Sequence, residues 1–170
     1  MDLGRYIRTV PDYPKKGIVF RDITPLLQIP TAFEEVIERL YTRWENNADA
    51  VVALDARGFI FGAPLALQLN VPFVPVRKKG KLPYKTHELS YGLEYGTDVV
   101  EMHVDALEKG SRALVVDDLL ATGGTAHAAG ELVKRTGATL AGYAFVIELS
   151  SLQGRKKLHS VPLQSLITYD

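Results

Sequence analysis

Short apolar runs alternate with longer amphipathic segments along this chain, and that alternation limits the folds open to it. Four runs rich in β-branched or small apolar residues have the length of buried strands: residues 50–54, 71–76, 112–116 and 140–149. Three segments carry apolar residues at helical spacing: residues 31–44, 59–69 and 125–136. Strands that alternate with helices predict an α/β fold with a mainly parallel central sheet flanked by helices.

Local signals suggest where some of these elements begin and end. A capping-box pattern that starts at Thr31 predicts the beginning of the first long helix. Residues 78–90 are polar and basic and contain glycine and proline, so they predict a long loop. Residues 93–95 and 98–104 predict strands on either side of a turn at Gly96.

Length and composition exclude several classes of protein. The chain has 170 residues, which suits one domain, 1–170, with a single core. Its formal net charge is zero, whereas nucleic-acid-binding domains carry a basic excess. The absence of cysteine excludes thiol nucleophiles, disulfides and Cys-ligated zinc. No apolar stretch has the length needed to cross a bilayer. We therefore expect a cytoplasmic protein that uses neither a membrane nor a nucleic acid as its partner.

The segment 113–125 carries the strongest functional signal. An apolar strand leads into Asp117 and Asp118, and a turn with two glycines then opens a helix. The free N–H groups at the start of a helix favour an anion, and glycines let the backbone approach it closely. The glycine spacing fits neither a Walker A loop nor a dinucleotide-binding fingerprint. An ordinary strand–turn–helix connection would explain a lone Gly-Gly-Thr, but the whole run favours a cradle for a phosphate monoester with two carboxylates beside it.

This run resembles the phosphoribosyl-pyrophosphate signature of the type I phosphoribosyltransferases. The resemblance assigns the ribose hydroxyls to Asp117 and Asp118. It assigns the 5′-phosphate to the residues of the following turn, which are Ala121, Thr122, Gly123, Gly124 and Thr125. It also implies the fold of that family, with a small N-terminal hood over residues 1–30 and a flexible active-site loop over residues 77–96.

Three further segments resemble the adenine-specific enzymes of the family. The first runs from Pro14 to Leu26 and is similar to the hood above the base. By resemblance Phe20 lies over the purine ring, and Val19 and Arg21 contribute neighbouring contacts. Stacking of flat apolar faces suits a purine. Without the resemblance, Phe20 would be read as an ordinary core residue.

The second segment, residues 53–62, is similar to the family's pyrophosphate loop. A strand, a tight turn and a helix start offer a second site for an anion. The resemblance assigns Arg57 to the base or pyrophosphate, and it implies a cis peptide bond between Asp55 and Ala56. Ala56 stands where the adenine enzymes often carry serine.

The third segment, residues 77–83, is similar to the start of the flexible loop that closes over the donor's pyrophosphate. Arg77, Lys78 and Lys81 are the matching cations. A solvated basic loop is the alternative interpretation of such a charge run. The family's glutamate beside the base falls on Glu94, either as an acid or base toward the purine or as a structural hydrogen-bond partner.

The resemblance as a whole implies transfer of a phosphoribosyl group from phosphoribosyl pyrophosphate to adenine, which gives AMP and pyrophosphate. Arg57, Lys78 and Glu94 would act in catalysis. Mg²⁺ would be held mainly by the substrate, so we expect no set of protein metal ligands. The family is usually homodimeric. Two alternatives stay open: a transferase for hypoxanthine, guanine or xanthine, and a non-catalytic regulator that senses phosphoribosyl pyrophosphate.

Overall fold

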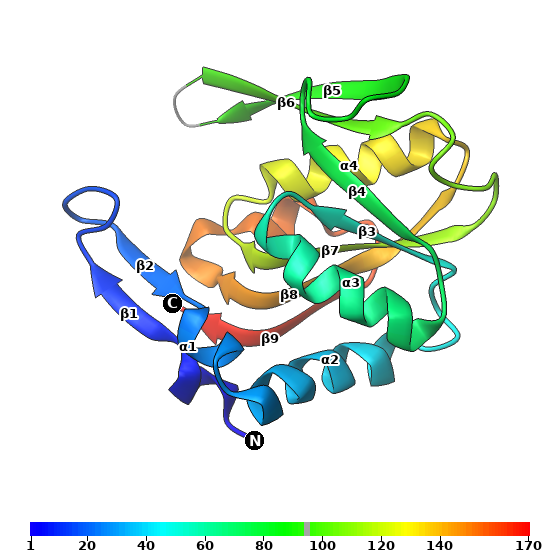
Figure 1. Cartoon of the computed structure of the whole chain (residues 1–170). Helices are drawn as coiled ribbons and strands as arrows, with labels where there is room; N and C mark the ends of the chain where they lie inside the picture. Colours follow the sequence, from blue (N-terminus) through cyan, green and yellow to red (C-terminus); the bar gives the residue numbers. More distant parts are fainter. Residues whose placement is uncertain (94–95) are drawn as a thin grey trace.

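The computed structural model describes residues 1–93 and 96–170 (Figure 1). Within these ranges, seven strands form one sheet in the order β5-β6-β4-β3-β7-β8-β9. Their bounds are β3 (Ala50–Leu54), β4 (Phe73–Lys78), β5 (Thr86–Leu93), β6 (Gly96–His103), β7 (Arg112–Leu120), β8 (Thr139–Leu149) and β9 (Leu163–Tyr169). The α-helices are α1 (Thr24–Leu27), α2 (Pro30–Trp44), α3 (Arg57–Leu69) and α4 (Gly124–Arg135).

Smaller elements lie at the two ends of the chain. Near the N-terminus, β1 (Arg8–Pro11) pairs with β2 (Val19–Asp22) in a separate antiparallel hairpin that projects from the body of the molecule (Figure 1). Three 3₁₀ helices complete the chain: η1 (Leu3–Tyr6), η2 (Ser150–Leu152) and η3 (Gly154–Lys157).

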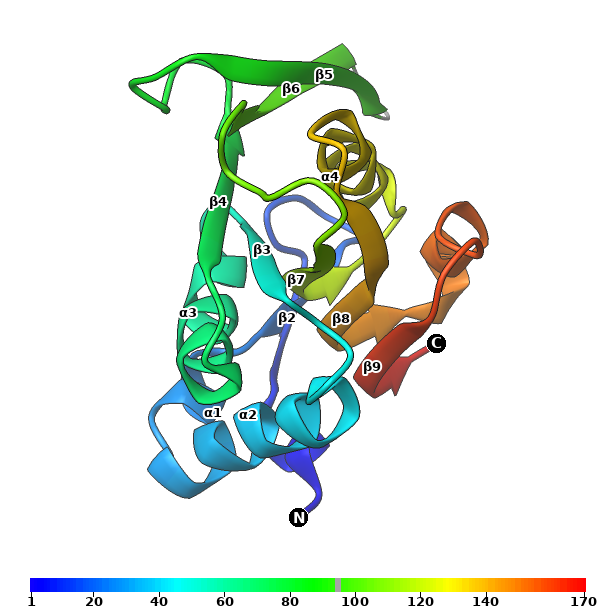
Figure 2. The ribbon, with the colours of Figure 1, turned by 90° about the vertical axis from the view of Figure 1, so that its right-hand side faces the viewer.

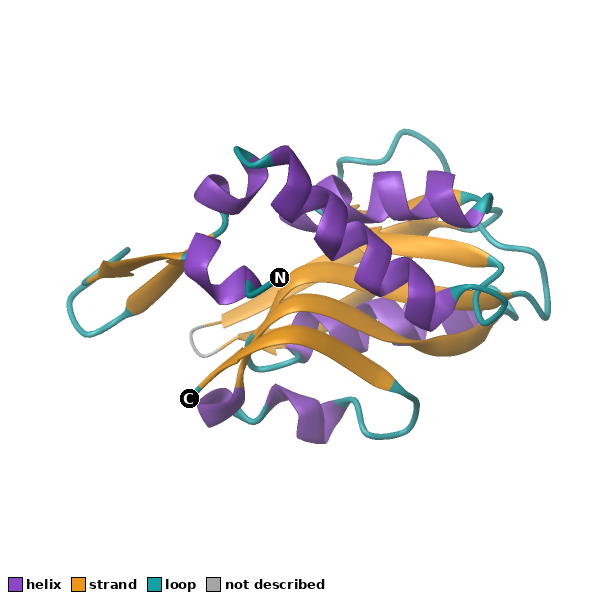
Figure 3. Cartoon of the chain, turned by 90° about the horizontal axis from the view of Figure 1, so that it is seen from below, coloured by secondary structure: helices purple, strands orange, loops and turns teal. Residues whose placement is uncertain are grey.

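The central sheet is mainly parallel, as the sequence predicted. Strands β4, β3, β7, β8 and β9 run parallel to one another, and Val52 of β3 lies opposite both Val74 and Val115. Helices cover both faces (Figure 3). Val51 and Leu114 pack with the helices α2 and α3, whereas Val52 and Val115 pack with α4. Alternate residues therefore serve opposite faces, which explains the continuous apolar runs of β3 and β7.

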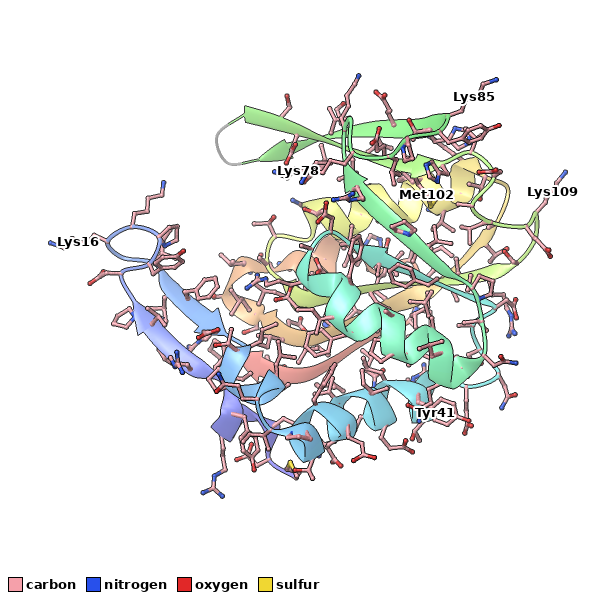
Figure 4. All side chains as sticks on the ribbon, in the orientation of Figure 1. Lys16, Tyr41, Lys78, Lys85, Met102 and Lys109 are labelled. Carbon is pink, nitrogen blue, oxygen red and sulfur yellow. The ribbon has the colours of Figure 1, made fainter. Side chains whose placement is uncertain are left out.

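The long loop predicted for residues 78–90 is only partly present, because residues 79–85 connect two strands and residues 86–90 belong to the second one. The eight residues from Thr86 to Leu93 form β5. This strand pairs antiparallel with β6, and the two extend the sheet beyond β4. This hairpin lies over α4 (Figures 1 and 2). Leu89, Val100 and Met102 belong to the core cluster on the α4 side (Figure 4). Polar and charged residues on either side of Leu89 concealed the strand pattern of β5, whereas β6 was predicted from residues 98–104. The expected strand 93–95 includes residues 94 and 95, which lie outside the described ranges. Gly96, which was expected to form the turn, is instead the first residue of β6.

Three other boundaries differ from the sequence-based expectations. The capping box is wrong, because α2 begins at Pro30 and its N-cap is Ile29, so Thr31 already lies inside the first turn. Strand β7 continues four residues beyond 116, so both acids lie within the strand. Strand β9 was not expected, since its polar residues hide its position at the edge of the sheet.

The core consists of two apolar clusters, one between each face of the sheet and its helices. Trp44, Phe61 and Phe145 are among the largest fully buried side chains. Within the described ranges, no helix is both long enough and apolar enough to cross a membrane.

Candidate active site

The turn after β7 forms a small cavity at the carboxyl edge of the sheet. The cavity has a volume of about 80 Å³, and its lining consists of Asp117, Leu119, Leu120, Ala121, Thr122, Gly123, Gly124, Thr125 and Ala126. Gly123 has a left-handed backbone with φ of 79° and caps α4 without a side-chain hydrogen bond. The first N–H groups of α4 are therefore available to a ligand. All five predicted phosphate-binding residues lie together around this opening, which suits an anion.

The two predicted ribose-binding acids meet the beginning of α3. The side chain of Asp118 is 5% exposed, and its Oδ2 atom lies 3.0 Å from Nε of Arg57. Asp117 Oδ1 accepts the N–H of Asp118 at 2.9 Å. Gly58 leaves room for Asp117, because a Cβ atom there would lie 2.9 Å from Asp117 Oδ1. Consecutive residues of α3 thus contact consecutive residues of β7.

Both acids have raised pKa values. Burial raises the pKa of Asp117 well above its ordinary value, and the negative charge of Asp118 raises it further. Burial also raises the pKa of Asp118, while the charge of Arg57 opposes that increase. Two adjacent carboxylates in one buried site disfavour a second negative charge. A ligand that brings hydroxyl donors or a cation would stabilise their ionised form.

The loop 55–57 gathers positive charge beside this pair. The Asp55–Ala56 bond is cis, as the family resemblance implied. Asp55 Oδ2 accepts a hydrogen bond from Nε of Arg77 at 3.0 Å and lies 3.7 Å from Nζ of Lys81. Arg77 Nη1 also donates to the carbonyl oxygen of Lys81 at 3.3 Å. Two of the three predicted loop cations therefore lie at the same carboxylate, two residues before Arg57.

The third cation, Lys78, has a different partner. Its Nζ atom lies 2.8 Å from Oδ2 of Asp98 in β6, and a hydrogen bond to that carboxylate raises the pKa of Lys78. Figure 4 shows Lys78 where β4 meets the β5–β6 hairpin. The structure therefore does not bring Lys78 into contact with Asp55 or with the acid pair.

The N-terminal hairpin approaches the site through Phe20. The guanidinium carbon of Arg57 lies 5.3 Å from the centre of the Phe20 ring. The ring also meets Tyr13 edge-on at 5.2 Å and lines an open cavity of about 270 Å³ with Val10, Tyr13 and Asp22. Val19 is exposed beside it. An aromatic face therefore lies next to Arg57, on the side where the hood was expected.

The side chain of Arg21 contacts other protein residues and does not face the open cavity beside Phe20. Its Nη1 atom donates to Thr9 Oγ1 at 2.6 Å, and its guanidinium carbon lies 3.9 Å from the centre of the Tyr169 ring. The Arg21 side chain therefore ties the hairpin to β9. The predicted site residue Glu94 lies outside the described ranges.

Comparison with known proteins agrees with this geometry. The family model described as a phosphoribosyl transferase domain matches residues 22–168. An adenine phosphoribosyltransferase of Synechococcus sp. is 54% identical over all of this chain and all of its own length. The chain belongs to the phosphoribosyltransferase family.

Solved structures lead to the same family. A crystal structure of adenine phosphoribosyltransferase from Thermoanaerobacter pseudethanolicus is 50% identical, with a TM-score of 0.95 over 99% of this chain and 98% of that one. The enzyme from Saccharomyces cerevisiae, crystallised with an imino-altritol bisphosphate and adenine, is 42% identical, with a TM-score of 0.93 over 97% and 96% of the two chains. These three relatives, which match over nearly the full length, are all adenine phosphoribosyltransferases.

One residue near the loop of this phosphoribosyltransferase escaped the sequence analysis. Glu101 of β6 is only 3% exposed. Its Oε1 atom accepts the backbone N–H groups of Lys81 and Leu82, both at 2.9 Å. Burial raises the pKa of Glu101, but the backbone donors outweigh it, so the net pKa is lowered. In sequence Glu101 looks like any charged residue on a strand, and only the fold shows that it holds the loop.

Proposed function

We propose that this chain transfers the 5-phosphoribosyl group of phosphoribosyl pyrophosphate to adenine and releases AMP and pyrophosphate. The observation that carries the proposal is the position of Arg57, which pairs with Asp118 at 3.0 Å and lies 5.3 Å from the Phe20 ring. One guanidinium thereby joins a sugar-side carboxylate to an aromatic surface suited to a flat base. The likeness to adenine phosphoribosyltransferases over the whole chain supports adenine as that base.

Each part of the site takes one portion of the donor in this proposal. Residues 121–125 bind the 5′-phosphate at the N-terminus of α4. Asp117 and Asp118 accept hydrogen bonds from the ribose hydroxyls. Arg57, Arg77 and Lys81 surround the pyrophosphate, and Lys78 joins them after exchanging its contact with Asp98. The three portions lie along one edge of the sheet, where parallel α/β folds bind ligands.

The chemistry is a substitution at the anomeric carbon of the ribose. A ring nitrogen of adenine forms the new bond to this carbon, the bond to the pyrophosphate oxygen breaks, and configuration inverts. The pyrophosphate leaves with the electron pair, and adenine loses one proton. Positive side chains stabilise the charge that develops on the leaving group. Closure of the loop 77–96 would exclude water from the reactive sugar.

The base-side roles follow the hood. Phe20 stacks on the purine, Val19 contacts it from the same strand, and Arg21 contributes backbone contacts, since its side chain is held by Thr9 and Tyr169. Glu94 exchanges a proton with the purine or fixes it by a hydrogen bond. The position of Glu94 beyond the described ranges makes this a proposal from the resemblance alone.

Mg²⁺ is the cofactor of this proposal. The phosphoribosyltransferase family generally depends on Mg²⁺. The described residues contain no group of three His, Asp or Glu side chains that could form a metal cage. The acid pair nevertheless fits a cation held mainly by pyrophosphate and water, because burial raises the pKa values of both carboxyl groups and a nearby cation would favour their ionised form. When bound, Mg²⁺ would offset the charge of the leaving pyrophosphate.

We further propose a homodimer formed through the outer face of α3. This face comprises Phe59, Ala63 and Leu67, at helical spacing, and the neighbouring Phe73. Leu67 is 82% exposed and Phe73 is 37% exposed. An exposed apolar patch of this kind is typical of an association surface. A cytoplasmic location stays a prediction, which cell fractionation would test.

A panel of bases tests the proposed reaction. The purified chain is mixed with Mg²⁺, phosphoribosyl pyrophosphate and one base at a time: adenine, hypoxanthine, guanine, xanthine or orotate. Nucleotide and pyrophosphate are then measured. The proposal expects AMP from adenine and little product from the others. Product from a 6-oxo purine would overturn the base assignment and keep the donor site. Donor binding without any product would favour the regulator.

A further inference from the structure

The backbone of Gly154 touches the phosphate-binding turn without lining its cavity. Gly154 is buried at the start of η3. A Cβ atom at this position would overlap the carbonyl oxygen of Ala121 and lie 2.9 Å from the nitrogen of Gly123. The contact is reciprocal, since a Cβ atom at Gly123 would lie 2.7 Å from the carbonyl oxygen of Gly154. The two backbones therefore pack directly against each other.

Gly154 is not required for an unusual backbone conformation. Its φ lies outside the left-handed region, in contrast to Gly123 with φ of 79°. Alanine would therefore meet no backbone strain at residue 154, and its methyl group would conflict only with its neighbours. These neighbours are Ala121, Gly123 and Leu120, which all line the cavity. Glycine is therefore required at residue 154 because the turn that follows β7 packs too closely to leave room for a side chain.

An ion pair between half-exposed Arg155 and the buried carboxylate of Glu148 fixes the segment that carries Gly154. Arg155 Nε and Nη2 bind the two carboxylate oxygens of Glu148 at 2.9 and 2.5 Å, and Nη2 also reaches Ser165 Oγ at 2.9 Å. The side chain of Glu148 is 8% exposed, and the hydrogen bonds from Arg155 lower its pKa. A two-pronged arginine contact restricts geometry more than a single bond does. Glu148 lies opposite Leu120, the last residue of β7.

We propose that Gly154, held by the Arg155–Glu148 pair, is a positioning residue that sets the shape of the turn 121–124 for a phosphate monoester. This inference rests on the proposed assignment of that turn to the 5′-phosphate. Arg155 and Glu148 act at a distance from the ligand, through the backbone of Gly154. An anion cradle made of backbone N–H groups loses affinity when its donors move by a fraction of an ångström.

Binding of AMP compared with adenosine measures this effect. The two ligands share the base and the ribose, so the ratio of their affinities reports the phosphate contacts. Isothermal titration calorimetry of Gly154→Ala should show AMP affinity reduced about tenfold, with adenosine affinity within about twofold of the wild type. In steady-state assays the KM for phosphoribosyl pyrophosphate should rise, while the KM for adenine stays nearly constant.

Gly142→Ala is the matched control for crowding. A Cβ atom at Gly142 would overlap the Trp44 ring and lie 2.5 Å from the carbonyl oxygen of Pro162, in a part of β8 distant from the turn. We expect a lower thermal unfolding temperature for this variant and an unchanged AMP-to-adenosine ratio. An equal loss of the ratio in Gly142→Ala would assign the effect to general destabilisation and overturn the proposal.

Arg155→Gln tests the ion pair and also serves if Gly154→Ala does not fold. Its control is Arg112→Gln, because Arg112 contacts Asp49 in the same two-pronged way at 2.9 and 2.7 Å. Arg155→Gln should lower the AMP-to-adenosine ratio, Arg155→Lys should restore part of it, and Arg112→Gln should leave it unchanged. An unchanged ratio in both Gly154→Ala and Arg155→Gln would overturn the proposal. Equal affinity of the wild type for AMP and adenosine would instead reject the phosphate assignment itself.

Discussion

The guanidinium carbon of Arg57 lies 5.3 Å from the centre of the Phe20 ring, although Arg57 opens α3 and Phe20 belongs to the N-terminal hairpin. The same guanidinium pairs with the buried carboxylate of Asp118. In the proposed reaction the Phe20 ring contacts the base and the Asp118 carboxylate contacts the sugar, so Arg57 lies close to both substrates. Its removal should therefore affect binding of the base and of the sugar together.

Arg57→Gln should lower kcat/KM about a hundredfold for both adenine and phosphoribosyl pyrophosphate, because the variant loses the charge near the leaving group. Steady-state kinetics with each substrate varied in turn would check this. Arg43→Gln is the control, since Arg43 also lies over an aromatic ring, that of Trp44 at 5.0 Å, but far from the site. A loss confined to one substrate would contradict the shared role.

Asp117→Asn should raise thermal stability at neutral pH while it impairs catalysis. The raised pKa of Asp117 means that the folded chain binds more protons than the unfolded chain between the ordinary aspartate value and the folded one. The wild type therefore loses stability as pH rises through that window. The advantage of Asp117→Asn should grow with pH and then level off. Each kcal/mol of change in the free energy of unfolding shifts Tm by about 2–4 °C.

Asp49→Asn is the control with the opposite sign. Hydrogen bonds from Arg112 lower the pKa of Asp49 to about 2. Ionised Asp49 therefore contributes stability above the ordinary aspartate pKa, and that contribution fades as pH falls toward about 2. Asp49→Asn should lower Tm near pH 7 and should differ little from the wild type in strong acid. Thermal melts from pH 3 to 8 would compare the two variants, and parallel curves would reject the electrostatic explanation.

Lys78→Ala and Lys79→Ala should differ although the two side chains are equally exposed, at 62%. Lys78 pairs with Asp98, the third residue of β6, whereas Lys79 pairs with Glu88 of β5. We expect the KM for phosphoribosyl pyrophosphate to rise about tenfold in Lys78→Ala, since a charge that reaches the pyrophosphate is lost. In Lys79→Ala the KM for phosphoribosyl pyrophosphate should stay within about twofold of the wild-type value, because a surface ion pair contributes little. Equal effects would mean that only the overall charge of the loop matters.

Phe20→Leu should raise the KM for adenine about twofold to tenfold, because the aliphatic side chain cannot stack on the ring. The KM for phosphoribosyl pyrophosphate should be unchanged. Phe20→Tyr keeps the aromatic face and should restore adenine affinity. If the KM for adenine is the same in Phe20→Leu and the wild type, Phe20 only packs within the protein and does not bind the base.

Leu67→Glu should convert the proposed dimer into a monomer, since it introduces a charge into the outer face of α3. Light scattering coupled to size-exclusion chromatography would measure the mass. Gln68→Glu is the control, because Gln68 is exposed on the same helix and donates to Glu38 instead. A monomeric wild type, or a dimeric Leu67→Glu, would remove this surface as the interface.

The sequence was most informative where local chemistry and fold agree. Apolar runs predicted four of the five parallel strands, all except β9, because strands with helices on both faces have no polar side. Residues 121–125 were assigned to one site because a turn before a helix is local in the chain. The cis bond after Asp55 was implied by family resemblance and is present. It did not come from spacing or composition.

Contacts between distant segments were not predictable in this way. Nothing local distinguishes buried Glu101 from an exposed strand residue, and nothing indicates that Gly154 packs against Gly123. The first part of β5 was mistaken for a loop, because its charged residues form ion pairs with neighbours such as Lys79, whereas β6 was predicted as a strand. Such partners become visible only after the chain has folded.

The contact between Arg21 and Tyr169 has a consequence for synthesis on the ribosome. The hairpin that carries Phe20 emerges among the first residues, but the ring that anchors it through Arg21 belongs to the last strand. A nascent chain folds from its N-terminus as it emerges. The anchor that Arg21 finds on Tyr169 therefore cannot form before β9 has been synthesised. We expect a ribosome-bound chain stalled before β9 to carry Phe20 on a hairpin that lacks this contact.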